Sequence, residues 1–305
     1  MTGAVRLIRR DRYGNELHRL DVAGRNEGAQ GVKVTKMEGI WHAPRTSTDE
    51  QGAFEEGSRP GLSRVEPRQV KLTFVTEEVD DDEFGQLSWE EADDNLWQVM
   101  PAKAFFVLQM DSRDGRQTRE LNLRRVIEPE PGRQDDPRDD GKMKWVTTST
   151  AHDPFWYGEE LYHEFIKGTG NGVGVVRDVV NPGDQPAVLK WIGRQNEAAE
   201  TWTLPDANAV YPVGHEKAGQ QVTHTIPQIP TGRHWMVDTH QLSEQLFIND
   251  TAQPISMMGG EFFSTYLPPT NDTGPIDLPV KVVGGTAWSG VRLVVPTRYD
   301  RPFGR

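Results

Sequence analysis

Short segments in which apolar and polar residues alternate recur along the whole chain, and most of them stop at Gly, Pro, Asn or Asp. Alternation turns every second side chain toward a core, so each segment predicts a half-buried β-strand. In the first half of the chain, the predicted strands cover 5–10, 16–20, 32–35, 70–74, 104–110, 117–123 and 144–150. Short Gly-containing turns separate 5–10 from 16–20 and 104–110 from 117–123, which predicts two hairpins.

The second half consists of strands and turns almost without interruption. Its predicted strands cover 160–165, 173–180, 187–192, 200–204, 222–226, 234–237, 245–248, 280–283 and 291–295. Turn sequences such as Asn181-Pro182-Gly183-Asp184 separate them. Regularly spaced short strands are typical of a β-sandwich or jelly roll. We therefore predict a mostly β protein with a boundary near Ala151 and domains at 1–150 and 151–305.

One segment has helical spacing instead. Ser88 and Glu91 have the spacing of a capping box, in which each side chain bonds the backbone N–H of the other residue. An apolar stripe at helical intervals follows, formed by Trp89, Ala92, Leu96 and Val99. Pro101 comes just after the stripe and disfavours its continuation. We predict one helix, over 88–100.

The segment 41–67 is rich in Gly, Ser, Glu, Arg and Pro and shows no period. Such a composition has too little apolar surface to form a core of its own. We predict a long loop or arm that becomes ordered along a neighbouring chain. Its candidate assembly residues are Trp41, Pro44, Phe54, Pro60 and Leu62.

The chain is acidic along its whole length. Its formal net charge is −12, and ten Asp and Glu residues lie between Lys71 and Lys103 with no Lys or Arg among them. Such a surface repels phosphates, so the composition disfavours specific nucleic-acid binding. Ordinary solubility is a sufficient reason for this charge. The wall of a channel past which DNA slides without adhering is a second interpretation, and charge by itself does not separate the two.

Motifs that carry chemistry are missing or wrongly spaced. The absence of cysteine excludes disulfides, thiolate metal sites and cysteine nucleophiles. The Gly-rich stretch 168–174 lacks Gly-x-Gly-x-x-Gly spacing, and no P-loop occurs. His163-Glu164 and His215-Glu216 each lack the second His of a zincin helix. The stretch 135–141 lacks the alternating ligands and final Glu of a calcium loop.

The sequence also gives no support for a serine nucleophile or for a pair of catalytic carboxylates. No Gly-x-Ser-x-Gly elbow presents a serine. Glu159 and Glu160 would point to opposite faces of a strand, a poor arrangement for glycoside hydrolysis. We predict that the protein is not an enzyme and has no catalytic, cofactor-binding or metal-binding residues. The N-terminus lacks the apolar core of a signal peptide and no run approaches a membrane span, so we expect cytoplasmic synthesis and no membrane insertion.

An aromatic cluster opens the second half, at 152–158. Exposed rings in this cluster would suit stacking on a sugar, whereas buried rings would plug the junction between two domains. We favour the plug. The candidate domain hinge is Asp153, Pro154, Phe155 and Trp156.

These residues also open a pattern that resembles the C-terminal domain of the distal tail proteins, minor tail proteins of long-tailed phages infecting actinobacteria. The segment Val179–Ala187, with Asn181-Pro182-Gly183-Asp184-Gln185-Pro186-Ala187 followed by Trp191-Ile192-Gly193, is similar to the Asn-x-Gly-Asp-x-Pro-Ala turn of that domain. The closing strands of the family's domain are similar to Trp235–Thr239, Phe262-Phe263 and Leu267-Pro268-Pro269 of this chain. The terminal motif of the family is similar to Tyr299-Asp300-Arg301-Pro302-Phe303. The first half matches in outline, through its hairpin, its arm, the start of the strand at Pro67–Val70 and its single helix.

The resemblance implies a tail-tube-like β-sandwich or barrel with one α-helix, followed by a galectin-like β-sandwich. It implies a homo-hexameric ring in the virion, at the distal end of the tail, that joins the tail tube to the tail-associated hub and fibres. The expected partners are the major tail tube protein, the tape measure protein and the hub or fibre protein. DNA would pass through the ring, and the candidate lumen-facing acids are Asp80, Asp81, Asp82, Glu83, Asp135 and Asp136.

Two other classes of function are alternatives. A carbohydrate-binding β-sandwich used in host adsorption requires exposed aromatic rings, and Trp156 and Trp191 are the residues to test. A glycosidase on a jelly roll requires two carboxyl groups that face each other across a cleft, about 5–9.5 Å apart. No sequence motif supports the glycosidase.

Overall fold

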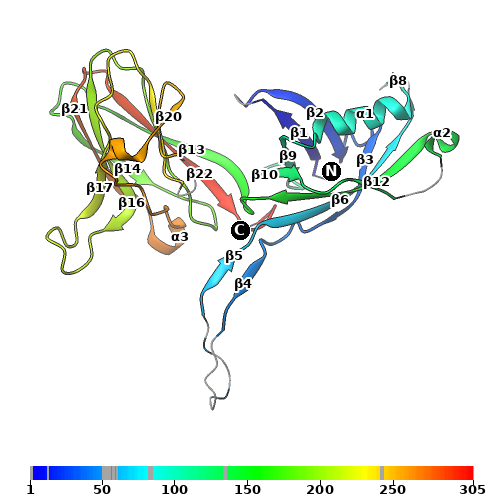
Figure 1. The fold of residues 1–305 in the computed structure, drawn as a ribbon, viewed down its shortest axis with the longest axis horizontal. Coiled ribbons are helices and arrows are strands. Elements are labelled where there is room, and N and C mark those ends of the chain that lie inside the picture. The colour runs from blue at the N-terminus through cyan, green and yellow to red at the C-terminus, as the bar shows by residue number, and fades with distance from the viewer. Residues whose placement is uncertain are drawn as a thin grey trace. The chain divides into compact units, whose positions relative to one another are not determined.

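The computed structural model describes residues 3–11, 14–49, 56, 59, 61–81, 85–132, 136–240 and 244–304. These residues are mostly in strands, and among them only one α-helix is longer than four residues (Figure 1). The prediction of a mostly β protein with one principal helix is therefore confirmed. The chain divides into two compact units, Met1–Gly158 with Tyr299–Arg305 (unit 1) and Glu159–Arg298 (unit 2). Ala151, the predicted boundary, falls inside unit 1, and the last residues of the chain return to that unit.

Most elements of the first half lie wholly in unit 1. They are β1 (Val5–Arg10), β2 (Glu16–Ala23), β3 (Val32–Glu38), β4 (Arg45–Ser47), β5 (Ser63–Val65), β6 (Arg68–Glu77), β7 (Val79–Asp81), β8 (Gly85–Leu87), α1 (Trp89–Val99), β9 (Phe105–Asp111), β10 (Thr118–Arg125), β11 (Glu130–Pro131), α2 (Pro137–Asp140) and β12 (Lys142–Ala151). β13 (Trp156–Ile166) begins in unit 1 and continues into unit 2.

An antiparallel sheet with the order β2–β1–β9–β10–β12–β6–β3 forms the body of unit 1. The register places Leu108 opposite both Leu7 and Leu121, and all three side chains are buried on the inner face. The helix α1 packs Leu96 and Val99 into the same core. The other face of the sheet carries the alternate, mostly polar residues, as a side-chain period of two requires.

The helix α1 begins where the sequence predicts. The Oγ of Ser88 accepts a hydrogen bond from the N–H of Glu91 at 3.3 Å, and the Glu91 carboxylate accepts one from the N–H of Ser88 at 2.9 Å. Asp93 then ties the helix to the sheet, because it accepts hydrogen bonds from the indole N–H groups of Trp97 at 2.8 Å and Trp145 at 2.5 Å. Trp145 lies on β12, so this contact fixes the helix against the inner face.

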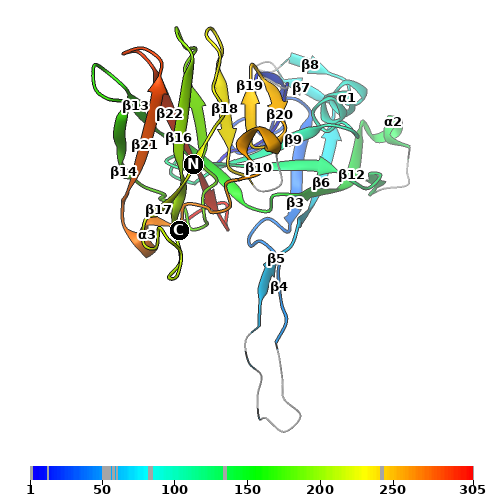
Figure 2. The same ribbon diagram turned by 60° about the vertical axis from the view of Figure 1, so that its left-hand side comes forward.

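The segment 41–67, expected to be a loop, contains a short hairpin. β4 pairs with β5, with Arg45 opposite Val65 and Ser47 opposite Ser63. The hairpin projects away from the sheet of unit 1 in both views (Figures 1 and 2). The prediction missed these strands because their pairing uses backbone groups while their side chains are mostly exposed, which leaves no apolar alternation.

Unit 2 contains the rest of β13 and the elements of the second half. They are β14 (Val173–Val179), β15 (Lys190–Gly193), β16 (Glu200–Val210), β17 (Gln221–Thr225), β18 (Trp235–Asp238), β19 (Leu246–Ile248), β20 (Thr251–Gln253), the 3₁₀ turn η1 (Ile255–Met258), α3 (Thr270–Thr273), β21 (Ile276–Gly284) and β22 (Gly290–Tyr299). β22 ends in unit 1 with its last residue.

Two antiparallel layers enclose the core of unit 2. One has the order β13–β22–β15–β18–β19–β20 and the other β14–β21–β16–β17. The fully buried Trp191 and Trp235 come from the first layer, and Trp202 comes from the second. The rings of Trp202 and Trp235 lie 5.8 Å apart between their centroids. Unit 2 is therefore a β-sandwich held together by large aromatic side chains. None of the helices that the structure describes is both long and apolar enough to cross a lipid bilayer.

Candidate functional site

The arm (residues 41–67) presents apolar side chains to solvent. Leu62 is 88% exposed and Trp41 is 55% exposed, and Pro44 is exposed as well. Phe54 and Pro60, the other two predicted assembly residues, lie outside the described residues. The exposed Leu62 side chain is available to a partner.

A buried arginine joins the arm to the rest of unit 1. Arg68, the first residue of β6, is 1% exposed. It donates hydrogen bonds to the carbonyl oxygen of Ile40 at 2.5 Å and to the carbonyl oxygen of Asp300 at 2.8 Å. Burial lowers the pKa of Arg68 to about 10, so the group remains charged at neutral pH. Ile40 and Arg68 flank the arm on its two sides, and we refer to residues 39–43 and 68 as the arm root.

The carboxylate of Asp300 binds the same root. It accepts hydrogen bonds from the backbone N–H of Ala43 at 2.9 Å and pairs with Nδ1 of His42 at 2.7 Å. Burial raises the pKa of Asp300, but its partners His42, Ala43 and Arg45 outweigh burial and hold this pKa below its ordinary value. Gly39 completes the turn, because its φ of 75° and the carbonyl oxygen of Gln69, 2.0 Å from where a Cβ would lie, admit no side chain.

The residues that follow β22 are themselves fixed to the sheet. Arg119 of β10 donates to the carbonyl oxygens of Arg301 at 2.6 Å and Gly304 at 2.5 Å. Its guanidinium carbon lies 3.5 Å from the centroid of the Tyr299 ring, a cation–π contact. The sequence prediction contained none of Arg68, Arg119 and Asp300 as site residues. Only the resemblance at Tyr299–Phe303 drew attention to the segment that they hold.

The predicted hinge residues form a packed turn. Asp153 accepts hydrogen bonds from the N–H of Phe155 at 3.3 Å and from the hydroxyl of Tyr157. Pro154 and Phe155 are buried. Trp156 has no exposed surface and donates its indole N–H to Ile40 at 3.0 Å. This turn therefore packs against the arm root, and whether it also acts as a hinge stays a prediction.

Burial of the tryptophans bears on carbohydrate binding. Trp156 and Trp191 are both fully buried, so neither ring can stack on a sugar. The carbohydrate-binding alternative thereby loses the two residues named for it.

Of the candidate lumen-facing acids, Asp80 and Asp136 are exposed. Asp81 ends β7, and its side chain is outside the described set, as are Asp82, Glu83 and Asp135. Asp80 shares a pocket of about 290 Å³ with Glu78 and Glu91. In the described part of the chain, no three His, Asp or Glu side chains are grouped to hold a metal ion.

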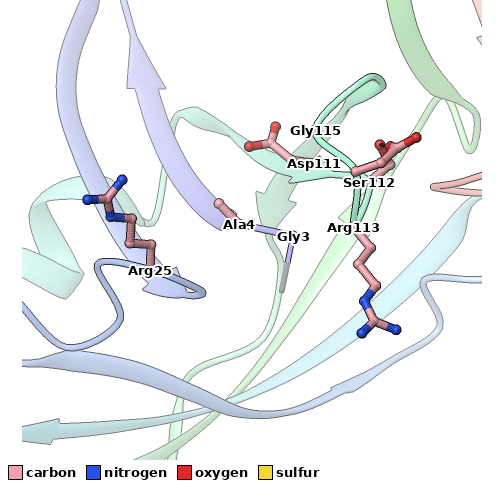
Figure 3. A pocket seen from close by; sticks show the side chains of 8 residues that line it. Gly3, Ala4, Arg25, Asp111, Ser112, Arg113 and Gly115 are labelled. Carbon is pink, nitrogen blue, oxygen red and sulfur yellow. Dashed lines mark hydrogen bonds between the residues drawn. The ribbon is translucent and has the colours of Figure 1, made fainter. Parts of the chain in front are cut away.

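A larger cavity of about 610 Å³ lies in unit 1, between Gly3, Ala4, Arg25 and the turn 111–115 (Figure 3). The guanidinium groups of Arg25 and Arg113 point away from each other rather than toward a common point (Figure 3). The carboxylate of Asp111 is paired with Arg6 at 2.7 Å. The polar groups that line this cavity therefore do not converge on one position, whereas those of a ligand site do.

Comparison with known proteins identifies the fold. The sequence matches no family profile, and no curated protein is significantly similar to it. The crystal structure of the Dit protein of phage SPP1, described as a paradigm of the hub adsorption apparatus in phages infecting Gram-positive bacteria, superposes with a TM-score of 0.55 at 10% identity. The match covers 98% of this chain and 99% of that one.

Chains of the phage P2 baseplate in its activated conformation superpose as well. The TM-score is 0.57 for the structure with calcium and 0.59 for the structure with strontium, each at 9% identity over 99% of this chain and 100% of the other. Since the likeness runs over both units, it is not the product of one common sandwich. The chain has the fold of phage hub and baseplate proteins.

Proposed function

We propose that this protein is a structural subunit of a phage tail tip, which forms a ring between the tail tube and the tail-associated hub and fibres. The observation that carries the proposal is the likeness to the SPP1 Dit protein over 98% of this chain. The likeness extends over the backbone of both units. A ring subunit needs a defined backbone because it presents assembly surfaces to its neighbours. The role requires no catalytic group.

The finer parts of the proposal come from the sequence motifs. Unit 1 is the tail-tube-like part, unit 2 is the galectin-like part, and six copies make one ring in a long-tailed phage of actinobacteria. The partners are the major tail tube protein, the tape measure protein and the hub or fibre protein. A ring closes when each copy offers its neighbour two different surfaces related by rotation.

The arm supplies one of these surfaces in the proposal. Its strands β4 and β5 have almost wholly exposed side chains, and Leu62 next to β5 is 88% exposed. A neighbour that covered Leu62 and Trp41 would remove apolar surface from water, which stabilises an assembly by about 25 cal/mol per Å². We propose that the arm lies along the adjacent copy.

The acidic residues line the lumen in the proposal. Asp80 and Asp136 are exposed, and a carboxylate surface repels the DNA backbone, so DNA would pass without adhering. Asp81, Asp82, Glu83 and Asp135 belong to the same two acidic segments of the sequence.

The experiment is to determine the mass and shape of the purified full chain in solution by light scattering and negative-stain electron microscopy. We expect closed rings of six copies in equilibrium with single chains. A variant with residues 46–64 replaced by a short Gly-Ser linker keeps the unit 1 core and should remain a single chain. A second variant with the exposed loop 211–220 of unit 2 shortened is the matched control and should assemble normally.

Two results would contradict the proposal. The first is a chain that stays monomeric at every concentration and is missing from purified virions. The second is an arm-deleted variant that forms the same rings as the unaltered chain, which would remove the arm from the assembly surface.

A further inference from the structure

We infer that the C-terminal segment 299–304 is a latch that fixes the direction of the arm, and that Arg68 and Asp300 are its positioning residues. The inference rests on the proposed function in one respect, because it treats the arm as an assembly element. It adds a specific cause for the arm's orientation: the last residues of the chain hold its root.

One buried guanidinium, that of Arg68, connects the two sides of the arm root. Arg68 follows the second strand of the arm, and Ile40 precedes the first. The hydrogen bond from Arg68 to the carbonyl oxygen of Ile40 therefore closes the root, and the bond to the carbonyl oxygen of Asp300 ties that closed root to the C-terminal segment. A charge that is 1% exposed needs such partners, because burying it without them is costly.

The side chain of Asp300 contacts the residues just before β4 directly. Its two carboxylate oxygens contact different groups, the ring of His42 and the backbone N–H of Ala43. Because the two contacts are to successive residues, they fix both the position and the direction of the backbone at the start of the arm. Edge-on packing of Trp41 against Phe303, with centroids 6.3 Å apart, adds a third contact between the same two segments.

The latch is anchored to the sheet independently of the arm. Arg119 holds the carbonyl oxygens of Arg301 and Gly304 and stacks on Tyr299. Arg119 is 3% exposed and belongs to β10, in the body of the sheet. The arm root is thus connected to the sheet through a segment that the sheet holds by separate bonds.

The strands of the arm have few packed side chains. All three side chains of β4 are exposed, as are Ser63 and Arg64 of β5. Side-chain packing on the strands therefore contributes little to the arm's direction, which leaves the root to determine it. A chain truncated before residue 299 would therefore lack a fixed arm.

The test is limited trypsin digestion of the full-length chain. Arg45 and Arg64 are cleavage sites on the two strands of the arm, whereas Arg59 precedes Pro60 and resists trypsin. Asp300→Ala removes the carboxylate contacts to both His42 and Ala43. We expect it to be cleaved at Arg45 and Arg64 at least about tenfold faster than the unaltered chain, since loss of even one hydrogen bond to a charged group predicts a change of about that size. Cleavage at sites in unit 2 should not change.

A milder variant and a matched control accompany it. His42→Ala removes one latch contact from a side chain that is 66% exposed, so it keeps the fold if Asp300→Ala does not, and it should be cleaved faster at the same two sites. His234→Ala removes an equivalent exposed pair, His234 with Asp250 at 3.2 Å in unit 2, and should leave arm cleavage unchanged. Ring assembly of the two latch variants should require a several-fold higher protein concentration.

The possible outcomes test the latch and the ring as two separate proposals. If both latch variants are cleaved and assemble like the unaltered chain, the latch is wrong while the ring stands. Faster cleavage with unchanged assembly supports the latch as the element that holds the arm and overturns its part in ring formation. If the unaltered chain never assembles, the proposed function fails, and the cleavage rates alone then decide whether segment 299–304 holds the arm.

Discussion

At the residue scale, His224 on β17 lies between two carboxylates in unit 2. It is 8% exposed. Its Nδ1 is 3.2 Å from Glu261, and its Nε2 is 3.6 Å from Asp206. Asp206 in turn accepts hydrogen bonds from the backbone N–H groups of Ser264 and Thr265. The histidine and Asp206 therefore hold the loop before α3 against β16 and β17.

The charges around His224 give this contact a pH dependence. Burial lowers the pKa of His224, but Asp206 and Glu261 outweigh it, so the net shift is upward from 6.5. A raised folded-state pKa contributes stability that is complete below the unfolded value, about 6.5, and is lost as the pH rises through the folded value. Burial raises the pKa of Asp206, but its partners lower it further, and its contribution is lost only as the pH falls through that lowered pKa.

We predict that the thermal midpoint of unit 2 falls as the pH rises through the raised pKa of His224, and that His224→Gln removes this fall. Thermal unfolding between pH 5 and 9 measures it. His234→Gln changes an exposed histidine that also pairs with an aspartate, and it should keep the slope of the unaltered chain. Identical pH slopes for His224→Gln and the unaltered protein would show that His224 does not carry the effect.

At the element scale, the capping box of α1 accounts for where the helix begins. Ser88→Ala removes the side chain that accepts the N–H of Glu91, and loss of such a cap costs about 1 kcal/mol. That energy corresponds to about a fivefold increase in local opening. We predict faster hydrogen exchange of the backbone amides in the first turns of α1, measured by mass spectrometry. Ser88→Asp keeps a capping oxygen and should exchange like the unaltered helix; equal exchange in Ser88→Ala would contradict the role of the cap.

Elements with a buried face could be predicted from the sequence. The predicted strand at 5–10 is β1, and the predicted helix contains α1. The pair β4–β5 was missed because its three-residue strands have mostly exposed side chains and so show no alternation. The pair β7–β8 was missed because strands of three residues are too short to show a period. Trp89 was assigned to the apolar stripe of the helix, but it is only partly buried, because the sheet covers α1 at Ala92, Leu96 and Val99 instead.

The candidate site was predictable only where it is local in sequence. The segment 41–67 was singled out by its composition and the turn at 153–156 by its adjacent aromatic residues, and their roles in assembly and as a hinge stay predictions. The latch did not follow, because Arg68 reaches its partners across 28 and 232 residues of sequence. No periodicity connects positions so far apart, and an isolated Arg or Asp in a charged chain has no feature that marks it as buried. Only the folded backbone brings them together.

At the scale of the whole molecule, the chain enters unit 1 twice, at its beginning and at its end. Unit 2 has its own core of Trp191, Trp202 and Trp235, and residues 159–298 are continuous. Unit 1, by contrast, depends on residues 299–304 for the carbonyl partners of Arg68 and Arg119. The two units should therefore respond differently when they are separated.

We predict that fragment 159–298 unfolds cooperatively on its own, whereas fragment 1–158 is destabilised relative to the same unit with the C-terminal residues present. Arg68 would lose one carbonyl acceptor and Arg119 would lose two, and a buried group left unsatisfied costs about 1–3 kcal/mol. That loss is a large fraction of the roughly 5–15 kcal/mol that stabilises a domain. Thermal unfolding of fragment 1–158 should move to a lower temperature than that of 1–158 joined through a Gly-Ser linker to residues 299–305.

The linked fragment with Asp300→Ala separates the contribution of the backbone carbonyls from that of the Asp300 carboxylate. It keeps the carbonyl acceptors for both arginines and loses only the carboxylate contacts to the arm root. It should therefore retain most of the recovered stability while its arm is cleaved faster than that of the linked fragment that keeps Asp300, and equal melting of the linked and unlinked fragments would show that unit 1 is complete without its C-terminal return.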